Sequence, residues 1–357
     1  MRIAVIGAYG YTGKLICKEL QDAGFEFSIY GRNLKKIKIL KEELNNVDKA
    51  GSIDLRKKTD IELLILEADI FINCAGPFTE ESSLFLETIA ERGKIYLDIT
   101  GEIGFVRSSG ELYHQKAKKA KSIIIHGCAF ESLLADLAVQ KIASNEVAID
   151  VVNTFYKFNK HSISPGTRIT MKLAKFRDSL KIKNKQWCIS EAKHDHLKET
   201  LDKTMEQTAI PYPLPEIAYA HWNWNVNDAA SFLIITTEEA MFFSGTTDPV
   251  GDPLERLDKI RVRKKNGPTI EERANQKSEL FVRVLDENKK EHILLLKSSD
   301  MYLLTAKAIA LAVQKIVTNG SGNYGVISPS QLFLDDLDTI IKKLNIELIE
   351  QPNFIIG

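Results

Sequence analysis

Short apolar runs alternate with amphipathic segments through the first third of this chain. The apolar runs cover residues 3–6, 26–30, 70–73, 95–99 and 122–126, and helical spacing of apolar residues marks 14–23, 34–44 and 81–91. Continuous apolar runs separated by helices are typical of buried parallel strands in α/β domains. The pattern predicts a Rossmann-type domain over residues 1–146, with a mainly parallel sheet of about six strands.

The pattern changes after residue 146. Longer alternating stretches occur at 147–158, 229–243, 279–285 and 293–297, with a turn-like segment at 286–289. Alternation over this length indicates half-buried antiparallel strands. We therefore expect a second α+β domain over 147–299, with a largely antiparallel sheet and a helix at 167–180. Trp222 and Trp224 alternate on a predicted strand. They line a substrate pocket, or they pack in a sheet or dimer face.

The last part of the chain is again helical in pattern. Residues 301–317 have the composition of a long apolar helix, and 330–344 have amphipathic spacing. We expect residues 300–357 to form helices that pack back on the nucleotide domain.

A glycine-rich turn follows the first predicted strand and opens the first predicted helix. It reads Gly7, Ala8, Tyr9, Gly10, Tyr11, Thr12 and Gly13. In such a turn the first glycine permits the bend, the second lets the backbone approach the phosphates, and the third allows helix and strand to pack closely. The backbone amides and the positive end of the helix suit a pyrophosphate, so this segment predicts a dinucleotide site.

The end of the second predicted strand bears on the choice of cofactor. An NAD site usually has a carboxylate here for the ribose hydroxyls, whereas this chain has Gly31, Arg32 and Asn33. A guanidinium can pair with a 2′-phosphate, helped by Asn33 and by Lys35 or Lys36. We favour NADP over NAD, the alternative being that Arg32 is a solvated surface charge.

Three later loops fall at the carboxyl ends of predicted strands, where ligands bind in open α/β sheets. They contain Ala75, Gly76, Pro77 and Phe78, then Thr100 and Gly101, then Cys128. We expect them to surround the nicotinamide. Phe78 either covers the cofactor or belongs to the core. Cys128 either lies beside the nicotinamide or is an inert buried thiol.

Candidates for proton transfer are few. Asp98 and Glu102 lie near one strand end and can relay a proton or orient a carboxamide, although turn and helix capping is a simpler explanation for both. The phenol of Tyr302 can donate a proton, although a helical aromatic is more often part of the core. The sequence leaves the catalytic residues unassigned.

Charge and composition exclude several classes of protein. The 357 residues carry 48 basic and 48 acidic side chains, so the global charge that favours nucleic-acid binding is missing. His194 and His196 stand two apart without a nearby ligand cluster, so no metal is expected. The short basic run at 261–265 is most simply an exposed strand end, with anionic lipid or a thioester's phosphates as the alternative.

Cysteine usage and hydropathy indicate the cellular setting. The four cysteines are far apart and form no CxxC pair, and the apolar stretch at 229–243 is interrupted by Glu238 and Glu239. We expect a cytoplasmic protein without a transmembrane segment, acting on a small molecule. The antiparallel sheet of the second domain suggests a homodimer.

These motifs resemble those of the saccharopine dehydrogenase-like oxidoreductases, which include the trans-acting enoyl reductases. The resemblance rests on the loop at 7–13 with 31–33, on 73–78 and 96–102, on 127–136, on 300–306, and on 325–329. It implies an NADP-binding Rossmann domain, a second domain that shapes the substrate site, and hydride transfer. Within that family it implies an enoyl thioester or lipid substrate, or alternatively saccharopine reduction; we lean towards the former, because no arginine cluster for three carboxylates is evident.

One segment departs from the family pattern. Where the family has Gly-Phe-Asp-Ser-Val-Pro, this chain has Ala129, Phe130, Glu131, Ser132, Leu133 and Leu134, followed by Asp136. The departure leaves a second reading open, in which the protein binds NADP as a sensor or scaffold without catalysis.

Overall fold

The structure contains one parallel sheet and one largely antiparallel sheet. It is a computed structural model that describes residues 1–78, 83–159, 163–167, 179–190, 207–236, 267–320 and 322–352. The chain divides into unit 1, with residues 1–133 and 302–344, and unit 2, with residues 134–301 and 345–357. The sequence places these divisions at 146/147 and 299/300.

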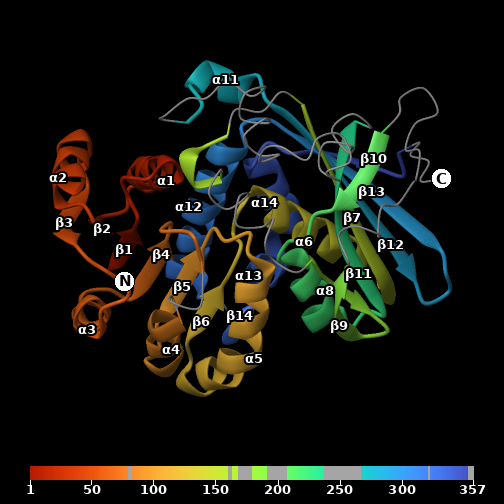
Figure 1. Cartoon of the computed structure of the whole chain (residues 1–357), viewed down its shortest axis with the longest axis horizontal. Helices are drawn as coiled ribbons and strands as arrows, with labels where there is room; N and C mark the ends of the chain where they lie inside the picture. The colour runs from red at the N-terminus through yellow and green to blue at the C-terminus, as the bar shows by residue number, and fades with distance from the viewer. Residues whose placement is uncertain are drawn as a thin grey trace, which may run out of the picture. The chain divides into compact units, whose positions relative to one another are not determined.

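Unit 1 is built on sheet A, which has seven strands in the order β14-β6-β5-β4-β1-β2-β3 (Figure 1). Their bounds are β1 Ile3–Ile6, β2 Phe27–Gly31, β3 Val47–Ser52, β4 Ile70–Asn73, β5 Ile95–Asp98, β6 Ile123–Ile125 and β14 Gly325–Ile327. Every neighbouring pair is parallel. The strand order reverses beside β1, and this is where open α/β sheets bind dinucleotides.

Helices connect the strands of sheet A. They are α1 Tyr11–Asp22, α2 Leu34–Glu43, α3 Lys58–Glu67, α4 Ser83–Glu91, α5 Ile103–Ala120 and α12 Met301–Asn319, with α6 Phe130–Ala143 following β6. Buried residues of α5 recur at Ile103, Val106, Ser109, Tyr113 and Ala117, which is the spacing of one helix face. The inner strands β1, β4 and β5 are buried along their whole length, because helices cover both faces of a parallel sheet, whereas the edge strand β3 is only partly buried.

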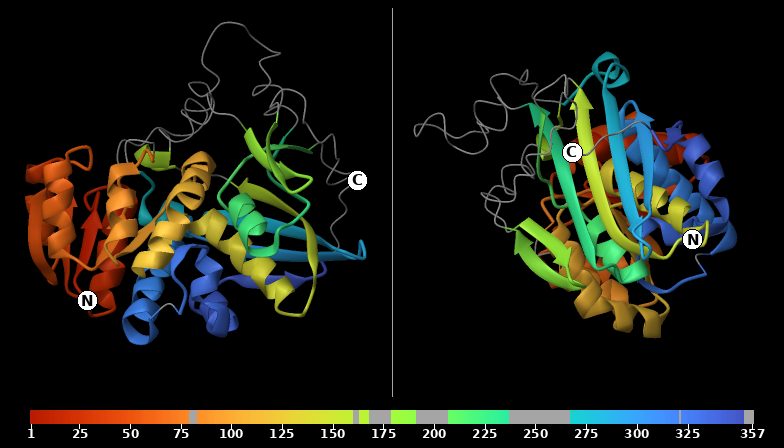
Figure 2. Two further views of the ribbon diagram at one scale, coloured as in Figure 1. Left: turned by 90° about the horizontal axis from the view of Figure 1, so that it is seen from below. Right: turned by 90° about the vertical axis from the view of Figure 1, so that its right-hand side faces the viewer.

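Unit 2 contains sheet B, an eight-stranded sheet with the path β15-β13-β12-β7-β11-β8-β9 and β10 paired to β11 (Figure 2). The bounds are β7 Ile149–Asn159, β8 Ser179–Lys183, β9 Gln186–Ser190, β10 Gln207–Pro211, β11 Asp228–Thr236, β12 Lys277–Asp286, β13 Glu291–Ser298 and β15 Glu347–Glu350. All pairs are antiparallel except β7 with β11. The short helices α8 Glu216–Trp224 and α11 Ile270–Ala274 also belong to this unit, as does α6 from residue 134 onwards.

The predicted fold class is confirmed, with corrections in detail. Trp222 and Trp224 lie on helix α8 and not on a strand. Leu180, at the end of the helix expected over 167–180, lies in β8, while residues 168–178 are outside the described residues. The helix expected over 330–344 is divided into α13 Pro329–Leu332, a 3-10 turn Leu334–Asp336 and α14 Leu337–Lys343.

Helix α12 is long and apolar enough to cross a membrane by length and composition alone. Its most apolar stretch has a mean hydropathy of 1.3, and 56% of that stretch is buried inside the protein. Its buried residues include Leu304, Ile309 and Val313. Burial of this kind is typical of a helix in the core of a folded domain.

Candidate functional site

The phosphate loop joins β1 to α1 by a bend that only glycine accommodates. Gly7 has φ +76°, and a Cβ there would lie 2.8 Å from the backbone N of Ala75. A Cβ on Gly13 would lie 2.5 Å from the carbonyl O of Gly7, so the third glycine brings α1 close to the bend. Gly7 N–H donates to the carbonyl O of Tyr30 at 2.8 Å, which fixes the loop to the end of β2.

The middle glycine leaves room for a ligand. A Cβ on Gly10 would meet only the carbonyl O of Gly7 within 4 Å among the described residues, so the loop is otherwise open at this position. Gly10 is also the N-cap of α1, and no side chain caps the helix there. The first amides of α1 are therefore directed at the open side of the loop, which suits a pyrophosphate.

The end of β2 presents a cationic surface beside this loop. Arg32 is exposed and forms no ion pair within the described ranges. The ring of Tyr9 lies against Gly31, where a Cβ would be 2.5 Å from Tyr9 Cε1, and Lys36 Nζ stands 5.4 Å from the centre of the Tyr9 ring. Asn33 uses its Oδ1 to accept from Lys36 N–H at 3.1 Å, so it caps α2.

Hydrogen bonds of Asn73 hold the loop after β4, and the tip of that loop is exposed. Asn73 Oδ1 accepts from Ala75 N–H at 3.0 Å, and Asn73 Nδ2 donates to Tyr96 Oη at 3.1 Å. Gly76 and Pro77 are exposed, whereas Phe78 is buried against Phe105, with ring centres 5.8 Å apart. Phe78 is thus part of the core of unit 1. The Gly76–Pro77 backbone lies at the carboxyl edge of sheet A, which we call the ligand edge.

Both carboxylates that the sequence singles out are buried and hydrogen-bonded. Glu102 accepts from the Thr100 hydroxyl at 2.7 Å, from Gly101 N–H at 3.1 Å and from Phe78 N–H at 3.4 Å. Asp98 Oδ1 accepts from Thr100 N–H at 3.1 Å. Asp98 thus caps a turn, as the simpler explanation has it. Glu102 stands at the N-cap of α5, but its carboxylate bonds to the preceding loop and to Phe78 and does not cap the helix.

Asp98 has a further partner that the sequence did not suggest. Its Oδ2 lies 2.6 Å from His126 Nδ1, and His126 Nε2 lies 2.7 Å from Ser109 Oγ. All three side chains are buried. Because Asp98, Ser109 and His126 come from β5, α5 and the end of β6, only the alignment of these elements brings them together.

Of the remaining candidates, Tyr302 lies in the first turn of α12, and Cys128 lies in the loop between β6 and α6. Cys128 is 1% exposed, in accord with a buried thiol. The Tyr302 ring packs edge-on against Tyr11 of the phosphate loop, with ring centres 4.9 Å apart. One turn later, Thr305 Oγ1 accepts from Phe130 N–H at 3.0 Å. The start of α12 therefore joins the phosphate loop to the loop after β6.

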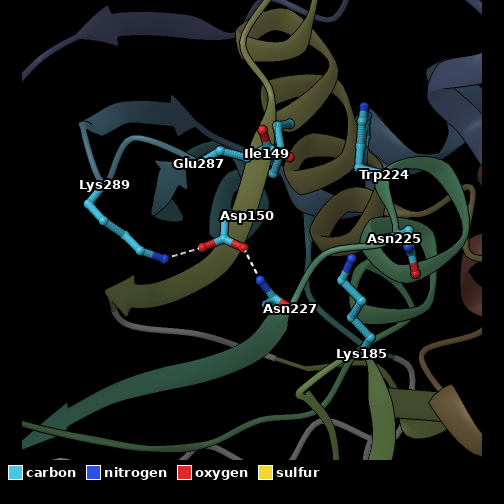
Figure 3. A pocket seen from close by; sticks show the side chains of 8 residues that line it. All are labelled: Ile149, Asp150, Lys185, Trp224, Asn225, Asn227, Glu287 and Lys289. Carbon is cyan, nitrogen blue, oxygen red and sulfur yellow. Dashed lines mark hydrogen bonds and ion pairs between the residues drawn. The ribbon is translucent and has the colours of Figure 1, made fainter.

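Unit 2 has a polar cavity of about 350 Å³ among its described residues (Figure 3). At its centre the buried carboxylate of Asp150 is bonded by Asn227 Nδ2 and Lys289 Nζ. The Lys289 ammonium lowers the pKa of Asp150. Asn227 and Lys289 already pair with the buried Asp150 carboxylate. We therefore interpret this cluster as a structural link between β7, β11 and the β12–β13 turn.

Comparison with known proteins identifies sequences similar to the part of the chain that contains the phosphate loop. Residues 3–125 match the family model of the saccharopine dehydrogenase NADP-binding domain. The match covers the amino-terminal part of the chain, which contains the phosphate loop. The resemblance inferred from the motifs is thereby confirmed, and so is NADP as the cofactor.

Relatives by sequence are similar over this part of the chain. A trans-acting enoyl reductase of Mycobacterium tuberculosis is 29% identical over 150 residues, which are 41% of this chain and 36% of the relative. One of Mycobacterium ulcerans is 26% identical over 145 residues, or 39% of this chain and 35% of the relative. The match thus spans about a third of the length of these relatives.

One solved structure is similar over nearly the whole chain. The apo saccharopine dehydrogenase (L-Glu forming) of Saccharomyces cerevisiae has a TM-score of 0.62 and 10% identity, covering 98% of this chain and 99% of that one. At this identity the similarity concerns the fold alone.

Sequence reasoning found the residues of the phosphate loop and the strand-end loops, and it missed the partners of Asp98. His126 lies directly before the Gly127–Cys128 turn, so its place at a strand end was readable. Ser109 gave no signal beyond its position on the apolar face of a helix. The roles of the predicted site residues in binding and catalysis stay predictions.

Proposed function

We propose that this protein is an NADPH-dependent oxidoreductase that transfers hydride to a small-molecule substrate, with a conjugated carbon–carbon double bond of an enoyl thioester or lipid as the first candidate. NADPH, when bound, supplies the hydride. The protein's own residues bind the cofactor at the carboxyl edge of sheet A. Reduction of the double bond also requires one proton, from a side chain or from water.

The observation that carries the proposal is the pairing of an open phosphate loop with a cation free for a 2′-phosphate. Gly10 leaves the approach to the first amides of α1 open, and Arg32 stands exposed at the end of β2 without an ion pair in the described ranges. A planar guanidinium binds a phosphate through paired hydrogen bonds. This arrangement supports NADPH over NADH.

The described charges of unit 2 support a substrate with few carboxylates. Two arginines fall within its described residues, and both are ion-paired: Arg273 with Asp300, and Arg283 with Glu291. Recognition of three carboxylates, as in a glutamate–aminoadipate conjugate, usually requires arginines that are free to pair with the ligand. Within the described residues of unit 2, this favours an enoyl substrate over a saccharopine-type one.

The first experiment is a titration of the purified protein with NADPH and with NADH, followed by absorbance-monitored NADPH oxidation. The substrates are short- and long-chain enoyl thioesters, glutamate with aminoadipate semialdehyde, and simple aldehydes. We expect tighter binding of NADPH and turnover with an enoyl thioester. Turnover only with the semialdehyde and glutamate would replace the enoyl proposal by saccharopine reduction.

Tight NADPH binding without turnover of any of these substrates would favour the sensor or scaffold reading. The altered segment from Ala129 to Leu134 supports that alternative. It forms the start of helix α6, and Leu134 continues that helix where the family pattern has a proline. A homodimer and a cytoplasmic location remain part of the proposal. Sedimentation at several protein concentrations tests the first, and cell fractionation tests the second.

A further inference from the structure

Three buried polar side chains in unit 1 form a continuous chain of hydrogen bonds that the proposed reaction does not use. Asp98 Oδ2 contacts His126 Nδ1 at 2.6 Å, and His126 Nε2 contacts Ser109 Oγ at 2.7 Å. Their exposed fractions are 0%, 0% and 1%. Such a network of buried polar groups is costly unless every member is bonded, so its presence calls for a physical role.

The connectivity is that of an acyl-transfer triad, but the burial is not. A nucleophilic serine must reach a substrate, and Ser109 lies on the buried face of α5 in line with Val106 and Tyr113. The His126 ring is also enclosed, with Phe105 and Tyr96 packed edge-on at 5.3 and 5.8 Å between ring centres. Nucleophilic catalysis by this serine is therefore excluded.

The other end of the network holds the backbone of the ligand edge. Asp98 Oδ1 accepts from Thr100 N–H at 3.1 Å and from Gly127 N–H at 2.9 Å. The backbone carbonyl of Asp98 accepts from Cys128 N–H at 2.9 Å. One residue thus ties the loop after β5 to the loop after β6.

The loops that Asp98 joins belong to one half of the nucleotide site. Sheet A reverses its strand order beside β1, with β2 and β3 on one side and β4, β5 and β6 on the other. A dinucleotide lies across this point, and the end of β2 takes the ribose of its adenosine half. The loops after β5 and β6 are consequently on the nicotinamide side.

We propose that Asp98, His126 and Ser109 form a positioning network that fixes the backbone of Thr100–Gly101 and Gly127–Cys128 for the nicotinamide half of the cofactor. The assignment rests on NADPH binding in the proposed function, and not on turnover. Asp98 supplies the acceptor, His126 holds its second oxygen in place, and Ser109 anchors the imidazole to α5. All three are positioning residues, since none of them is exposed to a ligand.

The test separates the two halves of the cofactor. Dissociation constants of NADPH and of adenosine 2′,5′-bisphosphate, which lacks the nicotinamide half, are measured for the unchanged protein, His126→Gln, Asp98→Asn and Ser109→Ala. We expect His126→Gln and Asp98→Asn to weaken NADPH about 10-fold or more, the effect of losing a strong hydrogen bond, and to leave the bisphosphate within about 2-fold. Ser109→Ala removes only the outer anchor and is expected to weaken NADPH about 3-fold.

Ser122→Ala is the matched control. The Ser122 hydroxyl is also buried beside β6 and donates to the carbonyl oxygens of Ile89 and Ala90 at 2.8 and 3.0 Å, at the end opposite the ligand edge. Its loss is expected to lower the unfolding temperature and leave both dissociation constants unchanged.

Three outcomes would overturn the assignment. Equal weakening of both ligands would show general damage to the domain, and unchanged NADPH binding in every variant would show that the network has no part in the site. Absence of NADPH binding by the unchanged protein would overturn this assignment and the proposed function together. Binding without turnover would affect only the proposed function.

Discussion

Two buried carboxyl groups, Asp98 in unit 1 and Glu216 in unit 2, are held in opposite ways. Both oxygens of Asp98 are bonded, by two backbone amides and an imidazole. Glu216 accepts hydroxyl donors from Thr154, Tyr156 and Ser231 on Oε1 alone, while its Oε2 has no hydrogen-bond partner among the described residues.

The difference lies in what each donor can do. A backbone amide can only donate, so Thr100 and Gly127 require an acceptor at Asp98. A hydroxyl can turn and accept elsewhere, so the three donors around Glu216 tolerate either protonation state of the carboxyl group. Burial raises the pKa of Glu216 above its usual value. We infer that Asp98 serves the ligand edge, whereas Glu216 fastens the first turn of α8 to strands β7 and β11.

The largest expected effect is on stability, from Glu216→Ala. This change removes the shared acceptor of three buried hydroxyls and leaves a cavity beside sheet B, so we expect a loss of about 3 kcal/mol in the free energy of unfolding. Urea denaturation measures it, with the exposed Glu287→Ala as control. A loss below about 0.5 kcal/mol would show that α8 does not depend on this carboxyl group.

The second largest expected effect is on cofactor affinity in unit 1. Arg32→Ala removes the cation proposed for the 2′-phosphate, and we expect about 10- to 100-fold weaker NADPH binding with NADH nearly unchanged. Fluorescence titration measures both, and Lys38→Ala, an exposed change farther along α2, is the control. An equal loss of affinity for the two cofactors would contradict the role given to Arg32.

A third prediction concerns pH and Glu216. Because the folded-state pKa is raised, the neutral acid is fully tolerated below the unfolded value, near 4.5, and stability falls as the pH rises from there through the folded pKa. Glu216→Gln keeps a neutral side chain, so the stability difference between the variant and the unchanged protein should shift in favour of the variant by about 1.4 kcal/mol per unit of pKa shift. Thermal unfolding between pH 4.5 and 8 measures the difference, and a constant difference across that range would be evidence against a raised pKa of Glu216.

The smallest expected effect comes from the surface of the unit 2 cavity. The Lys289 side chain is 67% exposed, whereas that of its partner Asp150 is 8% exposed. We expect Lys289→Ala to cause only a small loss in the free energy of unfolding above pH 5, because water can solvate the Asp150 carboxylate in place of the exposed ammonium. Since Lys289 lowers the pKa of Asp150, this contribution is lost as the pH falls through the folded pKa of Asp150. Denaturation at pH 7 and at pH 3 compares the two, and Lys290→Ala is the neighbouring control.

Local patterns were enough to predict the elements that carry a local signal. The glycines of the phosphate loop are required by a bend within seven residues, and the strands at 3–6, 70–73 and 95–98 are apolar on both faces. Helix α8 was misread, although its own signals exist: Pro215 and Glu216 at its start, and Asn225 in the left-handed conformation at its end. The alternation of Trp222 and Trp224 alone favours a strand, whereas these terminal residues favour a helix.

The sequence by itself determined the Rossmann-type domain, its phosphate loop and the cation after β2, because each depends on neighbours within one turn or one strand. Only the tertiary structure decided that β14, three residues long, joins sheet A beside β6, since so short a strand is stabilised by pairing with a partner about 200 residues away. It likewise decided the network of Asp98, His126 and Ser109. Those side chains meet through the register of β5 with β6 and the packing of α5, and no spacing along the chain encodes either.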